Sequence, residues 1–282
     1  MEITSAQNPK IKHLLQLQQK SQLRRKEGLF VVEGRRELEH CLAAGYELDS
    51  LFINEAVADS KRYTLNSTLN EAQLFTLNAS LYERVAYRGS TEGVIAIVKE
   101  RRFTLNDLAE RLSTPLPPAG GVGGGAVGAV SPLIIVLEGV EKPGNLGAVL
   151  RSADAAQADA VIVCDPLTDL YNPNLIRASI GAVFTVPTVA CTSQECISFL
   201  QQNGISILTA QLQDSHLYYD TDMRRPTAIV MGTESTGLTD QWRQAATAHI
   251  RIPMLGQLDS LNVSVSAAIL LFEAVRQRQQ TE

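Results

Sequence analysis

The sequence is poor in cysteine and histidine, and it has no apolar run long enough to cross a membrane. Its 282 residues contain four of each, and the histidines are scattered without a metal-binding spacing. Cys191 and Cys196 are close in the chain, but a C-x4-C spacing is not typical of a metal or redox site. These absences argue against a membrane protein, a disulfide scaffold and a metalloenzyme. We expect Cys41, Cys164, Cys191 and Cys196 to be reduced and mostly buried.

The N-terminal residues do not resemble a secretion signal. Met1 to Ser5 is polar and lacks the apolar region that such a signal requires. With 45% hydrophobic and 20% charged residues, the chain suffices for one large domain or two of ordinary size. Together with the reduced thiols, these features predict a cytoplasmic globular protein.

Positive charge is concentrated near the N-terminus. The formal net charge is −5, whereas residues 1–26 contain six basic residues against one acidic residue, Glu2. A basic segment on an acidic protein predicts local contact with phosphate groups. A solvated amphipathic helix would show the same pattern and is the alternative. The candidate phosphate contacts are Lys10, Lys12, Arg24, Arg25, Arg35 and Arg36.

Residues 115–132 are almost wholly Pro, Gly, Ala, Val and Ser and carry no charge. This composition predicts a flexible linker between an N-terminal domain of residues 1–114 and a C-terminal domain of residues 133–282. Gly123, Gly125 and Gly128 match the spacing of a dinucleotide-binding fingerprint. That motif must follow a strand and open a helix, whereas here it precedes a strand, so we reject it.

The apolar pattern predicts a small α/β domain before the linker, with helices over residues 8–19 and 36–44 and strands over 29–34, 51–53 and 93–98. After the linker, strands are expected over 133–137, 160–164, 183–189, 205–210, 228–231 and up to 252. Helices are expected over 146–156, 173–180, 194–202, 240–246 and from about 260 to 276. Continuous apolar strands that alternate with helices predict a parallel sheet covered on both faces. Ligands bind such sheets beyond the carboxyl ends of the strands.

Three polar loops follow predicted strands of the C-terminal domain. The first, residues 138–147, has Gly139 and Gly144 at P-loop spacing, but Asn145 replaces the lysine, which argues against a nucleotide-triphosphate site. The second covers residues 231–238 and the third residues 252–262. The first loop has a simpler interpretation, with Asn145 as a helix cap and Arg151, on the helix that follows, as a surface ion-pair partner. The simpler interpretation of the second loop is a tight turn. Ser260 or Asn262 is expected to cap the last helix.

Taken together, the three loops resemble the signature of the SpoU (TrmH) family of RNA ribose 2′-O-methyltransferases, within the SPOUT superfamily. The matching residues are Asn145, Gly147 and Arg151; Gly232, Glu234 and Gly237; and Ile252 to Met254 with Ser260 to Val263. A further element, Asn172-Pro173, Arg177, Ser179 and Gly181, is also similar. The N-terminal domain resembles the L30e-like substrate-binding domain of many such enzymes, at Thr4-Ser5, Asn8-Pro9, Ile11-Lys12 and Glu33 to Arg35.

The resemblance implies a parallel α/β sheet whose C-terminal stretch forms a trefoil knot, and a homodimer with active sites near its interface. It implies methyl transfer from S-adenosyl-L-methionine to a ribose 2′-hydroxyl, with no metal required. The implied catalytic residues are Asn145, Arg151, Glu234, Ser260 and Asn262, with Arg151 as the group that clamps phosphate and orients the hydroxyl. The implied cofactor contacts are Thr209, Met231, Gly232, Ile252, Met254 and Leu261, and close backbone approach is expected to explain Gly232.

The six basic residues named above would then bind RNA. We expect 23S ribosomal RNA as substrate, with tRNA as the alternative. A Rossmann-type enzyme of small molecules and a non-catalytic RNA-binding protein of the same fold are the competing functions. The former lacks a glycine fingerprint after its first strand, and the complete set of polar motif residues speaks against the latter.

Overall fold

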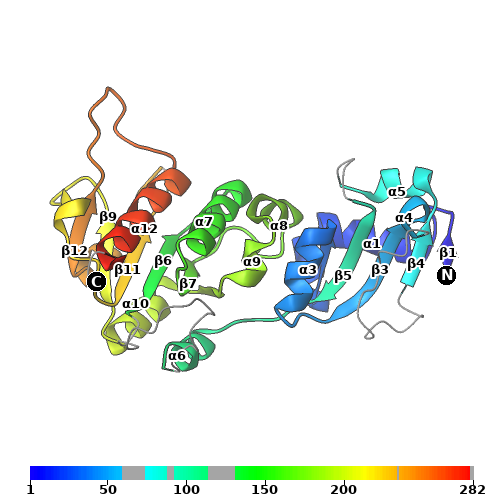
Figure 1. Cartoon of the computed structure of the whole chain (residues 1–282), viewed down its shortest axis with the longest axis horizontal. Coiled ribbons are helices and arrows are strands. Elements are labelled where there is room, and N and C mark those ends of the chain that lie inside the picture. The colour runs from blue at the N-terminus through cyan, green and yellow to red at the C-terminus, as the bar shows by residue number, and fades with distance from the viewer. Residues whose placement is uncertain (59–73, 88–91, 114–130, 234, 280–282) are drawn as a thin grey trace. The chain divides into compact units, whose positions relative to one another are not determined.

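A computed structural model describes residues 1–58, 74–87, 92–113, 131–233 and 235–279 (Figure 1). Nearly all of the predicted linker and the motif residue Glu234 lie outside these ranges. The chain divides into two compact units, one formed by Met1–Arg101 with Asp169–Thr185 and the other by Arg102–Thr168 with Val186–Glu282. In the described part of the chain, no helix has the length and apolar character that crossing a membrane requires.

The first unit contains a five-stranded sheet in the order β1-β4-β3-β5-β2, in which β5 runs antiparallel to both of its neighbours. Its apolar residues lie in one core, where Ile11, Leu14 and Leu17 from one helix face pack with Phe52 and Ile95 of the sheet. The strands are β1 (Glu2–Ile3), β2 (Leu29–Glu33), β3 (Leu48–Asn54), β4 (Leu74–Leu77) and β5 (Val94–Lys99).

The helices of the first unit begin and end at residues that the sequence marks. Asn8 caps the first helix by accepting a hydrogen bond from the backbone N–H of Lys10, and Pro9 occupies its first position. Gly28 ends the second helix in the left-handed conformation, at φ 64°. The helices are α1 (Pro9–Gln19), α2 (Ser21–Glu27), α3 (Arg35–Ala43), α4 (Glu55–Ala58), α5 (Ala79–Val85), α8 (Pro173–Ser179) and α9 (Ala182–Thr185).

The second unit is built on a seven-stranded sheet in the order β10-β12-β9-β11-β6-β7-β8, and every pairing in it is parallel. This confirms the predicted α/β class and parallel sheet; the trefoil knot stays a prediction. The strands are β6 (Leu133–Glu138), β7 (Ala160–Cys164), β8 (Thr188–Cys191), β9 (Ser206–Ala210), β10 (His216–Leu217), β11 (Thr227–Met231) and β12 (Ala248–Arg251).

The helices of the second unit are α6 (Leu105–Ser113), α7 (Pro143–Ala155), α10 (Ser193–Gln202), α11 (Asp240–Ala245) and α12 (Val263–Gln279). Leu108 of α6 is fully buried in a core shared with Ile134 and Trp242. The predicted domain boundary placed α6 in the N-terminal domain, whereas the compact units place it in the second. The division at residues 114 and 133 stays a prediction for the covalent linker, whereas by packing the first unit ends at Arg101 and also takes in Asp169–Thr185 of the predicted C-terminal domain.

The strand predicted over residues 183–189 is wrong. Residues 182–185 form the short helix α9, and the strand β8 begins only at Thr188. Ala182, Val183 and Phe184 are all buried, and an apolar run that is buried on every side has no periodicity to distinguish helix from strand.

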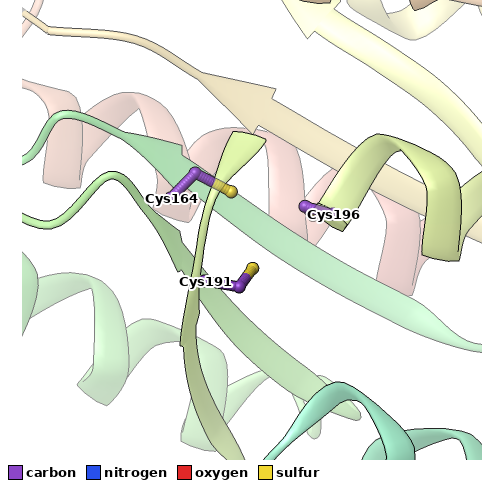
Figure 2. A group of neighbouring side chains, drawn as sticks. All are labelled: Cys164, Cys191 and Cys196. Carbon is purple, nitrogen blue, oxygen red and sulfur yellow. The ribbon is translucent and has the colours of Figure 1, made fainter. Parts of the chain in front are cut away.

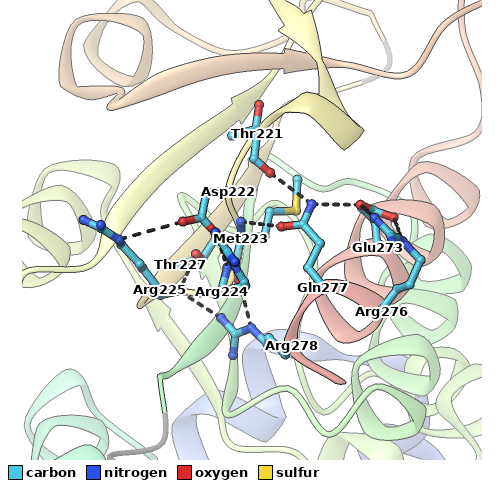
Figure 3. A network of polar contacts seen from close by, with 10 residues as sticks. All are labelled: Thr221, Asp222, Met223, Arg224, Arg225, Thr227, Glu273, Arg276, Gln277 and Arg278. Atoms are coloured by element: carbon cyan, nitrogen blue, oxygen red, sulfur yellow. Dashed lines mark hydrogen bonds and ion pairs between the residues drawn. The ribbon is translucent and has the colours of Figure 1, made fainter. Parts of the chain in front are cut away.

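Hydrogen bonds anchor the end of α12 to the segments that precede β6 and β11. Figure 3 shows those to the segment before β11. The Arg278 guanidinium donates to the carbonyls of Met223, at 3.0 Å from Nε, and of Arg225, at 3.0 Å from Nη2. It also donates to the carbonyls of Ser131 and Pro132. Burial lowers the pKa of Arg278. Because α12 packs against α7 and is fixed at this end, the position of its other end, which begins at the third motif loop, is set as well.

Candidate active site at the carboxyl edge of the parallel sheet

All three motif loops leave the same edge of the seven-stranded sheet, because its strands are all parallel. The first and second loops follow the neighbouring strands β6 and β11, which pair from Thr227↔Leu133 to Met231↔Leu137. The third follows β12, which is separated from β11 only by β9. Segments that lie about a hundred residues apart in sequence therefore meet where parallel sheets bind their ligands.

A hydrogen bond joins the first and third motifs. Asn262 Nδ2 donates to Asn145 Oδ1 at 3.2 Å. Asn262 Oδ1 accepts from the N–H and the hydroxyl of Ser264, at 2.9 and 2.6 Å, and so caps α12. The predicted cap at Asn262 is thus confirmed, and the same side chain also faces the first motif. Asn145 is not a cap, because α7 begins at Pro143 and Lys142 occupies the cap position.

The second motif forms a tight loop closed on itself. Thr233 and Gly237 exchange backbone hydrogen bonds of 3.3 and 3.1 Å. A Cβ on Gly232 would lie 2.2 Å from the carbonyl carbon and oxygen of Gly237 and 2.5 Å from the nitrogen of Leu238. Close backbone approach does explain this glycine, but the approaching backbone is the chain's own rather than a ligand that the sequence led us to expect.

Arg151 lies exposed on α7, two helical turns after Asn145. Among the described residues none forms an ion pair with it, so the alternative of a surface ion pair finds no support there. Ser260 is also exposed, two residues before the cap of α12. An exposed guanidinium is suited to binding a phosphate group, and an exposed hydroxyl is suited to hydrogen-bonding with a ribose.

Of the predicted cofactor residues, Thr209, Met231 and Ile252 lie at the ends of β9, β11 and β12, whereas Met254 and Leu261 lie further along the loop after β12. Met231 is buried, Ile252 and Met254 are half-buried, and Leu261 is 39% exposed. Thr209 pairs in register with Val230 on one side and His249 on the other. Its fully buried hydroxyl is hydrogen-bonded to His249 Nδ1 at 2.6 Å, so the side chain of Thr209 links β9 to β12. Its contact with a cofactor stays a prediction.

Sequence reasoning missed a buried polar cluster beneath the loops. The Glu138 carboxylate, 5% exposed at the end of β6, accepts from the N–H and hydroxyl of Thr239 at 2.9 and 2.6 Å. It also accepts from Ser193 Oγ at 3.2 Å, and Trp242 Nε1 donates to the same hydroxyl at 3.0 Å. Glu138 therefore fixes the loop after β11 to the start of α10. A carboxylate that ends a buried strand was the available signal.

A second missed residue is Gln211, directly after β9. Its Oε1 is buried and has no hydrogen-bond partner among the described residues, while its Nε2 donates to the Gln213 carbonyl. A buried acceptor without a donor is costly, so Gln211 Oε1 is available to a donor from water or from a ligand at this edge.

The basic residues of the first unit divide into exposed and buried ones. Lys10, Lys12, Arg25, Arg35 and Arg36 are exposed. Arg24 is 4% exposed, pairs with Asp169 at 2.7 Å and donates to the carbonyls of Leu17 and Gln18. Its prediction as a phosphate contact is corrected, because its guanidinium is already occupied inside the fold. The sequence could not reveal this, since its acidic partner lies 145 residues away.

Comparison with known proteins agrees with this geometry. Residues 132–272 match the SpoU rRNA Methylase family, and residues 8–96 match an MRM3-like substrate binding domain. A 23S rRNA (guanosine-2′-O-)-methyltransferase of Pseudomonas putida is 33% identical over 81% of this chain and 88% of its own. A solved RNA 2′-O ribose methyltransferase, 37% identical, superposes over 99% of this chain and 100% of its own with a TM-score of 0.75. The AdoMet-bound rRNA methyltransferase from Sinorhizobium meliloti, 26% identical, covers 98% and 97% with a TM-score of 0.81.

Proposed function

Because the chain belongs to the SpoU rRNA methylase family, we propose that it transfers a methyl group from S-adenosylmethionine to a ribose 2′-hydroxyl of 23S ribosomal RNA. The observation that carries this is the joining of the first and third motifs through Asn145 and Asn262 at the sheet edge where the second motif also lies. The names of the relatives favour a guanosine nucleotide as the methyl acceptor. They also favour ribosomal RNA over the tRNA alternative.

The residues at this edge fit S-adenosylmethionine. Gln211 Oε1 offers a buried acceptor that has no donor among the residues that the structure describes, and the adenine amino group, the ribose hydroxyls and the methionine ammonium are all donors. Met231 ends β11, and Ile252 and Met254 follow β12, so these three supply apolar surface at the ends of the two strands that flank β9. Leu261 lies further along the loop, just before α12. When bound, the sulfonium supplies an electrophilic methyl group. The chain's task is then to bind the cofactor, exclude water and present the 2′-hydroxyl.

Arg151 is the residue that we assign to the substrate side. Its exposed cation can hold the phosphate next to the acceptor ribose and orient the hydroxyl toward the methyl group. The hydrogen bond between Asn145 and Asn262 holds the loop of the third motif against the first motif. The exposed Ser260 lies two residues before Asn262 in that loop. Glu234 is retained as a catalytic candidate on the family motif alone, because it lies outside the described residues.

The test of this function separates binding from chemistry. Arg151→Ala should lower the single-turnover rate of methyl transfer to 23S RNA by on the order of 100-fold or more, while calorimetry shows unchanged S-adenosylmethionine affinity. Arg243→Ala is the matched control, since Arg243 is a partly exposed arginine on α11 of the same unit. Equal loss of rate and cofactor affinity would contradict the role of Arg151. If the wild type does not bind S-adenosylmethionine, the chain is better explained as a non-catalytic RNA-binding protein of the same fold.

The first unit contributes RNA binding through Lys10, Lys12, Arg25, Arg35 and Arg36, the exposed members of the predicted set. Support comes from the match of residues 8–96 to a substrate binding domain. Positively charged side chains on one unit can bind the RNA backbone without reading its sequence, which leaves specificity to other contacts. We therefore also propose that the enzyme acts on ribosomal RNA in the cytoplasm.

We also propose a homodimer formed through the second unit. Large apolar side chains are exposed around the third motif and along α12, namely Leu255 (96%), Leu258 (76%), Val265 (47%) and Phe272 (48%). Val265 and Phe272 lie seven residues apart and hence on the same face of the helix. Apolar surface concentrated beside a functional loop indicates a protein interface, and a second copy would cover the loop of the third motif.

A further inference from the structure

Three cysteines that are separated in sequence meet in the second unit (Figure 2). Cys164 ends β7, Cys191 ends β8, and Cys196 lies in the first turns of α10. Cys164 and Cys191 are register partners on the paired strands. The three sulfur atoms all lie within 4.8 Å of one another. Cys164 and Cys196 are fully buried, and Cys191 is half-buried.

We propose that Cys164, Cys191 and Cys196 form a binding site for a soft metal ion, with Zn²⁺ as its ligand. Zinc–thiolate bonds of about 2.3 Å in tetrahedral geometry place ligand sulfurs about 3.8 Å apart. The sulfurs here need to close by about 1 Å at most, which side-chain rotation can supply. Their spacing in sequence gave no sign of this site, because one ligand comes from each of three separate elements.

The charge balance favours a divalent ion over a monovalent one. Each thiol releases its proton as its sulfur binds, so Zn²⁺ and three thiols give a complex of charge −1 and three protons; a monovalent ion would leave −2. The N-terminus of α10, a ten-residue helix, lies at the cluster and favours negative charge there. Among the described residues no histidine or carboxylate joins the group, so the half-buried side at Cys191 leaves the fourth position to water.

Metal binding here would act on the region beneath the active site. The ion would tie β7, β8 and the start of α10 together. Ser193, at the first position of α10, hydrogen-bonds to Glu138, which in turn holds Thr239 of the loop after β11. Zinc should therefore raise the melting temperature of the protein and rigidify that loop.

The experiment uses the full-length protein, reduced and freed of metal. Zinc is titrated against a chromophoric chelator, and Co²⁺ is used as a spectroscopic substitute. We expect one ion per chain, thiolate-to-cobalt charge-transfer absorption in the near ultraviolet, and zinc binding weaker by on the order of 100-fold in Cys191→Ser. Cys41→Ser is the control, because Cys41 is a buried thiol of the first unit outside the cluster, and its zinc affinity should equal that of the wild type.

A second measurement needs no variant. Zinc should slow the alkylation of Cys191 in the wild type, since Cys191 is the accessible member of the three. The proposal is overturned if Cys191 is alkylated at the same rate with and without zinc, or if Cys191→Ser and Cys41→Ser bind zinc equally well. It is also overturned if the reduced protein takes up no zinc and its cluster instead oxidises to a disulfide.

Discussion

Replacing Gly232 by alanine would put a methyl group where the chain's own backbone already lies. The new Cβ would be 2.2 Å from the carbonyl of Gly237, whereas ordinary van der Waals contact begins at 3.4 Å. The obstacle is backbone, so the loop must open by about 1 Å rather than rotate a side chain away. Opening breaks the two hydrogen bonds between Thr233 and Gly237, each contributing about 1 kcal/mol.

Overpacking of this kind costs about 1–3 kcal/mol more, so we expect Gly232→Ala to lower the free energy of unfolding by about 3–5 kcal/mol. For a unit of this size that corresponds to a fall of about 6–20 °C in melting temperature. The loop displacement also moves Met231, so S-adenosylmethionine affinity should fall at least about tenfold, equivalent to about 1.4 kcal/mol. Calorimetry and thermal unfolding measure the two effects.

Gly144→Ala provides the matched control. A Cβ at Gly144 would meet nothing within 4 Å, and the residue lies within α7. Alanine should there stabilise the helix by about 0.5–1 kcal/mol and leave cofactor affinity unchanged. If Gly232→Ala has the same melting temperature and the same S-adenosylmethionine affinity as Gly144→Ala, the close backbone approach at Gly232 does not stabilise the loop, and the prediction is refuted.

Three further predictions concern other parts of the molecule. The double substitution of Lys10 and Lys12 by alanine should reduce the slope of log affinity for RNA against log salt concentration by about 2. Lys99→Ala is the control, because it removes a cation that is paired with Glu47 and should change the slope less. An unchanged slope in the double variant refutes RNA binding by α1. Phe272→Glu should convert the dimer to a monomer, as measured by analytical sedimentation. Leu167→Glu, which changes a side chain that is 67% exposed elsewhere in the second unit, should leave the dimer intact. A dimer that persists in Phe272→Glu refutes the interface. Burial raises the pKa of Asp159, so its contribution to stability is present below its unfolded pKa and is lost as pH rises through the folded pKa. Asp159→Asn should flatten that loss in denaturant midpoints measured upward from about pH 3.9, the unfolded value, and parallel curves would contradict it.

The sequence by itself determined the features that depend on neighbours along the chain. The cap at Asn262, the start of α1 at Asn8-Pro9, the apolar strands β6, β7 and β11, and the order of the three motifs are all local signals. They were sufficient to predict the α/β class and the family. They failed at residues 183–189, where complete burial removes the periodicity that distinguishes a helix from a strand.

Only the tertiary structure decided which distant groups share a site, because such contacts are set by strand order and packing rather than by local preference. It placed Asn145 against Asn262 across 117 positions and buried Arg24 against Asp169, which removes one predicted phosphate contact. It showed that Gly232 is required by the chain's own fold, and that Gln211 Oε1 is a buried acceptor with no donor in the described part of the chain, at the edge where the motif loops lie. It also brought together three thiols whose sequence spacing carried no signal, because parallel strands align residues that the intervening crossover keeps far apart in the chain.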